Sequence, residues 1–355
     1  MDSSIAPGPE PSSADDATSV GRSAPTPVTT RRGTMKAILH DRYGRPGVLK
    51  LREVDKPIIG DHQVLVRVHA SSVNPTEWYG VTGPYFARIG NGLRKPKDTT
   101  VGADLAGRVE AVAGDVKEFQ PGDEVLGISG GAWAEYACAR EDRLVLKPAN
   151  LSFEEAAAVP VAALTALQAL RDKGRIQPGH KVLINGASGG VGTFAVQIAK
   201  SFGAEVTGVC STRNVELVRS LGADHVVDYT QEDFTKRGER HDLMLDIAGS
   251  RSFFDFRRAL TPEATVVLVG GRMTYRGLGP LPHLLGTLVK SRGRRQKVIF
   301  FIAKITKADL AVLHELLETG KLKPVIDRKY QLSEASEALG YLGEGHARGK
   351  VVIYV

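Results

Sequence analysis

The sequence predicts an α/β protein that combines a small, partly open β-barrel with a doubly wound parallel sheet. Closely spaced apolar runs, divided by turn residues, fill the chain from residue 35 to about residue 128, and this pattern is typical of a small barrel. From about residue 152, helical patterns alternate with strands until about residue 301. Such alternation indicates parallel βαβ units, and 355 residues suffice for about two domains.

The composition limits the class of protein. Hydrophobic residues make up 42% of the chain, but no uninterrupted apolar run reaches the roughly 18 residues that a membrane-spanning helix needs. The only two cysteines, Cys138 and Cys210, can form neither a disulfide framework nor a four-cysteine zinc site, which fits a reducing compartment such as the cytoplasm. The net charge of +7 comes without a nucleic-acid-binding motif. We therefore expect no nucleic-acid partner and no integral membrane contact.

Residues 1–34 predict a disordered tail, because Ser, Pro, Ala, Asp and Thr dominate and little can be buried. The acidic start of this tail does not match a signal peptide. The strands expected in the barrel are 35–39, 48–54, 63–70, 104–113 and 124–128. The strands expected in the parallel sheet are 181–185, 204–210, 225–228, 242–247, 264–270 and 297–301. Helices near 307–319 and 333–342, an extended segment at 325–330 and a strand at 351–355 are expected to follow.

The segment 182–192 carries the clearest functional signal. A buried apolar strand breaks into glycines and restarts as an amphipathic helix, which is the context of a dinucleotide-binding turn. Gly189 lets the backbone approach a pyrophosphate, Gly192 lets the helix pack close to the strand, and the helix N-terminus attracts the anion. The alternative is an ordinary strand-to-helix turn. The residues expected to bind the cofactor here are Ala187, Ser188, Gly189, Gly190, Val191 and Gly192.

Four further segments carry a family resemblance: Ser72-Val73-Asn74-Pro75, 101–107, 119–125 and 345–352. With them the chain resembles the medium-chain dehydrogenase/reductase superfamily, in its zinc-free, quinone-oxidoreductase-like branch. The resemblance implies a GroES-like catalytic domain and a Rossmann NADP-binding domain, with the nicotinamide in the cleft between them. The implied division is 35–155 and 302–355 for the catalytic domain, and 156–301 for the cofactor domain. We also expect a homodimer.

The zinc ligands of other members of the superfamily are missing. Where those members have a cysteine and a Gly-His-Glu segment, this chain has Asn74 and Gly102-Ala103-Asp104. Asp104 alone cannot hold zinc, which takes about four Cys, His or carboxylate ligands, and the nine histidines are scattered. We therefore predict no metal. The remaining chemistry is hydride transfer to a carbon that conjugation makes electrophilic, as in a quinone or an enone.

The segment from Asn74 to Tyr79 resembles the active-site loop of quinone oxidoreductases. Tyr79 is a candidate to bond the substrate's carbonyl oxygen, and Asn74 to orient the amide or the substrate. The alternative for Tyr79 is packing under the loop. Glu77 is interpreted as a surface carboxylate or a turn stabiliser.

Four residues are candidates to lie near the nicotinamide. Thr165 resembles a family position there, with a hydrogen bond to its own helix as the alternative. Gly270 and Gly271 follow a strand at the edge of the sheet that borders the ligand cleft. Phe301 follows the last strand, and core packing is its alternative.

The end of the second parallel strand predicts the choice of cofactor. NAD-binding proteins place an acidic residue there, but this chain has Ser211, with Arg213 two residues on. A cation at a helix start is unfavourable unless an anion joins it, so Arg213 points to the 2′-phosphate of NADPH. Tyr229 resembles a family tyrosine near that phosphate. The alternative for Arg213 is a surface cation.

Residues 279–297 combine apolar residues with five following cations. We interpret them as a lid helix with a solvated basic end, and docking on a membrane surface is the alternative. The sequence as a whole predicts a zinc-independent, NADPH-dependent reductase of a small quinone or α,β-unsaturated carbonyl substrate, with Tyr79 or water as proton source. Two alternatives remain: a metal-free alcohol or ketone oxidoreductase, and a low-turnover NADPH-binding partner protein.

Overall fold

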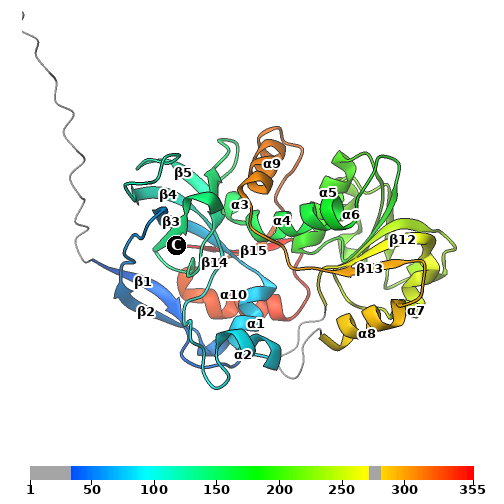
Figure 1. Ribbon diagram of the computed structural model, residues 1–355, viewed down its shortest axis with the longest axis horizontal. Helices are drawn as coiled ribbons and strands as arrows, with labels where there is room; N and C mark the ends of the chain where they lie inside the picture. Colours follow the sequence, from blue (N-terminus) through cyan, green and yellow to red (C-terminus); the bar gives the residue numbers. More distant parts are fainter. Residues whose placement is uncertain (1–32, 272–280) are drawn as a thin grey trace, which may run out of the picture. The chain divides into compact units, whose positions relative to one another are not determined.

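The computed structural model describes residues 33–271 and 281–355 (Figure 1). The predicted tail lies outside this range except for residues 33 and 34, and so do the first two residues of the segment 279–297.

The first sheet is the predicted barrel sheet, with seven strands. Its order is β14-β15-β3-β4-β5-β7, and β6 pairs with β3 (Figure 1). The strands are β3 Gln63–Val73, β4 Asp104–Val112, β5 Glu124–Ile128, β6 Tyr136–Arg140, β7 Leu144–Leu146, β14 Ile326–Gln331 and β15 Lys350–Tyr354. β1 Thr34–Leu39 and β2 Lys50–Asp55 form a separate antiparallel pair. Strands β6 and β7 were not predicted, because β7 has only three residues and β6 is rich in alanine, which disfavours strands.

The C-terminal strand β15 returns to the first sheet. It pairs antiparallel with β3, so that Val351 faces Val73. Helix α10 Ala335–Gly343 contacts the helix that follows β3, α1 Pro75–Thr82. The end of the chain therefore lies beside the predicted active-site loop.

The second sheet is parallel throughout, as predicted. Its order is β10-β9-β8-β11-β12-β13. The strands are β8 Lys181–Asn185, β9 Glu205–Cys210, β10 His225–Asp228, β11 His241–Asp246, β12 Leu260–Leu268 and β13 Lys297–Phe300. β12 begins earlier than predicted and ends two residues before Gly270.

Helices cover both faces of this sheet. Ile184 and Leu245 belong to the core under α4 Pro160–Gln168, α5 Gly190–Ser201, α6 Val215–Ser220 and α9 Lys307–Glu318. Leu183 and Met244 point to the other face, under α7 Phe253–Phe256 and α8 Leu281–Ser291. This alternation of buried residues is the signature of a doubly wound sheet. Of two further short helices, α3 Phe153–Ala157 contacts the barrel sheet and α2 Tyr85–Asn91 contacts α1. None of the described helices is long and apolar enough to cross a membrane.

Candidate functional site

The site is built where β3 ends and α1 begins. Asn74 is the N-cap of α1, and Pro75 occupies the first helical position, where a proline fits best. The Glu77 carboxylate accepts a hydrogen bond from the Asn74 backbone N–H at 2.8 Å, as in a capping box. This confirms that Glu77 stabilises the turn. It also shows that Glu77 is no surface carboxylate, since only 6% of the residue is exposed.

Asp104, fully buried at the start of β4, organises the residues around Asn74. Its Oδ2 accepts hydrogen bonds from Asn74 Nδ2 at 2.9 Å and from the Ser72 hydroxyl. Its Oδ1 accepts the backbone N–H of Val161 at 2.8 Å, in the first turn of α4. One carboxylate thus joins the barrel sheet to a helix that covers the parallel sheet.

Lys350 provides the positive charge of this cluster. Its Nζ lies 3.4 Å from Asp104 Oδ2 and donates a hydrogen bond to Asn74 Oδ1, and its side chain is 3% exposed. Lys350 also reaches the glycine turn, because a Cβ added to Gly190 would lie 3.0 Å from Lys350 Cδ. Gly349 forms a backbone bridge to Gly189. The predicted cofactor turn and the predicted catalytic loop therefore meet through Lys350.

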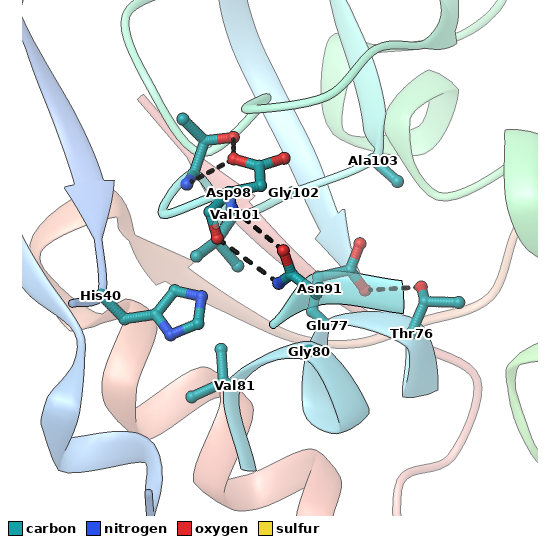
Figure 2. Close-up of a pocket in the computed structure, with 11 residues that line it drawn as sticks. His40, Thr76, Glu77, Gly80, Val81, Asn91, Asp98, Val101, Gly102 and Ala103 are labelled. Carbon is teal, nitrogen blue, oxygen red and sulfur yellow. Dashed lines mark hydrogen bonds between the residues drawn. The ribbon is translucent and has the colours of Figure 1, made fainter. Parts of the chain in front are cut away.

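The carboxyl group of Glu77 is perturbed. Burial, followed by the nearby charge of Asp104, raises the pKa of Glu77 to about 7. Glu77 and Thr76 are hydrogen-bonded to each other at 3.2 Å and line one side of a cavity of about 180 Å³. Figure 2 shows His40 across this cavity from them. Burial lowers the pKa of His40, so its neutral form is favoured there. Gly102 and Ala103, at the position of the missing histidine, line the same cavity.

Tyr79 is not among the residues that line this cavity, although the next residue of α1, Gly80, is. Its ring packs edge-on against Phe86, with 5.3 Å between the ring centroids, and burial raises the pKa of its hydroxyl. The packing that the sequence offers as the alternative role of Tyr79 is present, and no described residue forms a hydrogen bond with the Tyr79 hydroxyl.

The glycine turn has the geometry that a dinucleotide site needs. Gly186 has φ +98°, a conformation that favours glycine. A Cβ at Gly192 would lie 2.1 Å from the Gly186 carbonyl oxygen, so only glycine allows the helix this close to the strand. A Cβ at Gly189 would meet nothing but that oxygen, at 3.5 Å, which leaves space for a ligand. Ala187 is fully buried, whereas Val191 is partly buried against the core.

The end of β9 brings the predicted adenosine-side residues together. Tyr229 follows β10, which pairs with β9, and it is 53% exposed. Arg213 donates a hydrogen bond of 2.6 Å to the His346 carbonyl, so its guanidinium is held beside the loop before Lys350. The sequence reasoning missed Asn214, whose Nδ2 bonds both Ser188 and Ser211, at 3.0 and 3.1 Å. Its buried Oδ1 has no hydrogen-bond partner among the described residues.

The residues predicted near the nicotinamide come from three places in the fold: Thr165 from α4, Gly270 and Gly271 from the segment after β12, and Phe301 from the position directly after the edge strand β13. A Cβ at Gly270 would be 2.7 Å from the Ile247 carbonyl oxygen, and Gly271 contacts Gly249 closely. Thr165 donates a hydrogen bond to the Val161 carbonyl at 2.7 Å, which is the alternative weighed for it. Phe301 is partly buried against the core beside α4 and α9.

In the ranges 33–271 and 281–355, no three His, Cys, Asp or Glu side chains lie close enough together to hold a metal ion.

Two family models match the chain. The model described as "Alcohol dehydrogenase GroES-like domain" matches residues 60–149, and the one described as "Zinc-binding dehydrogenase" matches residues 221–353. The first covers most of the barrel strands, and the second covers the later part of the parallel sheet and the returning strand β15.

Several named proteins are similar over nearly the whole chain. The chloroplastic quinone-oxidoreductase QR1 of Triphysaria versicolor is 34% identical over 90% of this chain and 98% of that protein. The mitochondrial NAD(P)H oxidoreductase RTN4IP1 of Mus musculus is 35% identical, covering 92% and 91%. The 2-methylene-furan-3-one reductase of Solanum lycopersicum is 35% identical, covering 90% and 79%. Among solved structures, the quinone oxidoreductase of Coxiella burnetii superposes with a TM-score of 0.79 at 32% identity, covering 91% and 100%.

Proposed function

The chain belongs to the quinone-oxidoreductase-like branch of the medium-chain dehydrogenase/reductase superfamily, and on this premise we propose that it is a zinc-independent, NADPH-dependent reductase of quinones or α,β-unsaturated carbonyl compounds. The coarser activity follows from the relatives: it is an oxidoreductase that uses a nicotinamide cofactor. Its fold is a GroES-like domain joined to a Rossmann-like parallel sheet.

The Asp104–Lys350 pair is the observation that carries the metal-independent mechanism. A carboxylate at this position is a potential zinc ligand, but both of its oxygens already accept hydrogen bonds, from Val161, Asn74 and Ser72. The ammonium group of Lys350 supplies the positive charge that a carboxylate in such a buried place requires. A zinc ion would have to displace this lysine, and in the described part of the chain no three His, Cys, Asp or Glu side chains lie close enough together to hold it.

The glycine turn supports binding of the dinucleotide. The open space at Gly189 and the start of α5 suit a pyrophosphate, and the unpartnered Asn214 Oδ1 lies between the turn and the end of β9. The absence of a carboxylate at Ser211 and the presence of Arg213 support NADPH, because a guanidinium forms charge-assisted hydrogen bonds with a phosphate.

The bound cofactor would supply a hydride from its nicotinamide ring to the electrophilic carbon of the substrate. The negative charge then appears on the conjugated oxygen, and one proton completes the reduction. Tyr79 stays the side chain proposed to donate that proton or to bond that oxygen, with water as the other source. The Asn74–Asp104–Lys350 cluster holds the loop that carries Tyr79 against the glycine turn.

Three further features are proposals. The division into a catalytic domain (35–155 and 302–355) and a cofactor domain (156–301) is supported by the pairing of β15 with β3. A homodimer is supported by the open edge of β13, where Phe300 is 41% exposed. A cytoplasmic location is supported by the two free cysteines.

Oxidation of NADPH with a quinone, an enone and a plain ketone tests the function. We expect turnover with the quinone or the enone and none with the ketone. Turnover with the ketone alone would instead support an alcohol or ketone oxidoreductase. Tight NADPH binding without turnover on any substrate would support a partner protein.

A further inference from the structure

The basic segment after α8 is part of a groove that the proposed reaction does not use. This groove has a volume of about 460 Å³. Five arginines from separate parts of the chain line it, together with three other residues: Arg240, Arg257, Arg258, Arg294, Arg295, Pro262, Gly293 and Gln296. In the sequence, Arg294 and Arg295 belong to the basic segment after α8. The fold places Arg240, Arg257 and Arg258 in the same groove as these two arginines.

Among the described residues, carboxylates neutralise little of the positive charge of this arginine groove. Arg295 approaches Glu263 at 3.7 Å, but both side chains are largely exposed, so this pair is weak. Arg240 donates to the Leu260 carbonyl, which carries no charge. Arg258 and Arg294 form no ion pair with a described carboxylate. Clustered guanidinium groups of this kind bind phosphate oxygens well.

An apolar surface continues the arginine groove. Leu284 and Thr287 of α8 are buried against the sheet, whereas Leu285 and Val289 point to solvent with 58% and 63% exposure. Figure 1 shows α7 beside α8, and the two helices are in contact. Phe254 of α7 is 44% exposed.

Arg257 connects the two surfaces. Its guanidinium lies 5.9 Å from the centroid of the Phe254 ring and also lines the arginine groove. The ammonium group of Lys290 in α8 also lies 5.9 Å from the centroid of this ring. The exposed apolar side chains and the unpaired cations thus form one continuous face.

The arginine groove lies away from the proposed active site. Arg240 directly precedes β11 and Gln296 directly precedes β13, so the groove is at the amino ends of the parallel strands. The glycine turn follows the carboxyl end of β8, at the opposite edge of the same sheet. Binding at the groove therefore leaves the cofactor edge open.

We propose that the α7–α8 face and the arginine groove form a docking surface for a membrane that carries anionic phospholipids. The arginines would pair with the lipid phosphates, while Leu285, Val289 and Phe254 would enter the boundary between head groups and acyl chains. Charge complementarity selects this occupant, because excess cations beside exposed apolar side chains match an anionic lipid surface. The proposal is independent of the substrate and of the cofactor.

The test is sedimentation of the full chain with phosphatidylcholine vesicles, with and without phosphatidylglycerol. We expect binding only when phosphatidylglycerol is present, and less binding as salt increases. The Arg258→Gln/Arg294→Gln variant should bind roughly thirtyfold more weakly, since each cation near an anionic surface contributes about a factor of five. Leu285→Gln/Val289→Gln should also weaken binding, roughly tenfold or more. The control Lys50→Gln/Lys117→Gln removes two exposed lysines of the barrel domain and should bind like the parent.

Three outcomes would overturn the proposal. The first is that the parent does not bind the anionic vesicles, or that the lysine control loses as much binding as the arginine variant. The second is that tripolyphosphate binds through Arg258 and Arg294 while vesicles do not, which would make the groove a site for soluble anions. The third is that Leu285→Gln/Val289→Gln converts a dimer into a monomer while the parent ignores vesicles, which would make this face a subunit interface.

Discussion

Lys350 and Asp104 form an ion pair inside the protein, with 3.4 Å between Nζ and Oδ2 and almost no exposure of either side chain. Lys350 begins the last strand and Asp104 begins β4, 246 positions earlier. The pair also touches Asn74 and lies against Gly190, so one contact holds the predicted catalytic loop, the returning C-terminus and the cofactor turn together.

Removal of the lysine from this pair should destabilise the protein strongly. Lys350→Met leaves the Asp104 carboxylate buried without a countercharge, which costs about 3–5 kcal/mol of unfolding free energy. The control Lys329→Met, in β14 of the same sheet, breaks a partly exposed ion pair with Glu154 of α3. It should cost about 1 kcal/mol of unfolding free energy or less. Denaturant unfolding measures both. If both variants lose the same small amount of unfolding free energy, Lys350 does not compensate the buried charge of Asp104.

Glu77 should make stability depend on pH. Its pKa is raised from 4.5 to about 7 in the folded protein, so the folded state binds more protons than the unfolded state between these values. The contribution of Glu77 to the free energy of unfolding should therefore be greatest below about pH 4.5. It should fall by about 3 kcal/mol as the pH rises from there through about 7.

Glu77→Gln isolates that effect. Glutamine can still accept the hydrogen bond from the Asn74 backbone N–H and so keeps the helix cap, but it does not titrate. The variant should lose the fall in stability and be the more stable protein at about pH 8. Denaturant unfolding at about pH 5 and about pH 8 gives the comparison. The same slope in parent and variant would place the titration elsewhere.

Metal analysis tests the proposed mechanism directly. The purified protein should contain well under one zinc ion per chain, and chelators should leave NADPH oxidation unchanged, because the carboxylate of Asp104 is already paired with Lys350. Elemental analysis and activity after dialysis against a chelator are the measurements. Stoichiometric zinc that is lost together with activity would contradict the metal-independent reaction.

A conservative substitution tests the role of Tyr79. If its hydroxyl serves the reaction, Tyr79→Phe should lower turnover with an enone roughly tenfold to a thousandfold and leave NADPH binding unchanged. The ring contact with Phe86 survives in the variant, so the fold should not change. Tyr85→Phe, at an exposed neighbouring position, is the control. Full activity of Tyr79→Phe would assign the proton to another source.

The sequence predicted the parts of the fold that are marked by local patterns of residues. Every strand of the parallel sheet was expected, because buried runs and glycine turns mark them, and Gly192 packs as the glycine pattern requires. Strands β6 and β7 were missed, since alanine and a length of three residues give little local signal. β12 was expected to end at residue 270 and stops at Leu268.

The buried cluster could not be derived from local patterns. Lys350 stands among charged and flexible residues near the end of the chain, and nothing there shows that it is 3% exposed. Glu77 was interpreted as a surface carboxylate or a turn stabiliser, and only the first is wrong; it rested on the fact that most glutamates are solvated. Only the pairing of β15 with β3 brings these residues beside Asp104, and such long-range pairing leaves no periodic trace in the sequence.

The choice of cofactor gives the last prediction. NADPH should bind about thirtyfold more tightly than NADH, because Arg213 and the Ser211 hydroxyl can bond the 2′-phosphate. Charge-assisted hydrogen bonds contribute about 1.5–3 kcal/mol each, and solvent at this exposed edge reduces the sum to roughly 2 kcal/mol. Arg213 now donates to the His346 carbonyl, a neutral acceptor that a phosphate can replace.

Ser211→Asp/Arg213→Ala should remove or reverse the preference, because the new carboxylate repels the phosphate and accepts the ribose hydroxyl of NADH. Dissociation constants of both cofactors, titrated at fixed ionic strength, give the ratio for parent and variant. Arg219→Ala, which removes a nearby cation paired with Glu216, should keep the parent's ratio and exclude a general effect of charge. If the parent binds NADH as tightly as NADPH, or if the double variant keeps the parent's ratio, Arg213 is a surface cation whose partner is the His346 carbonyl alone.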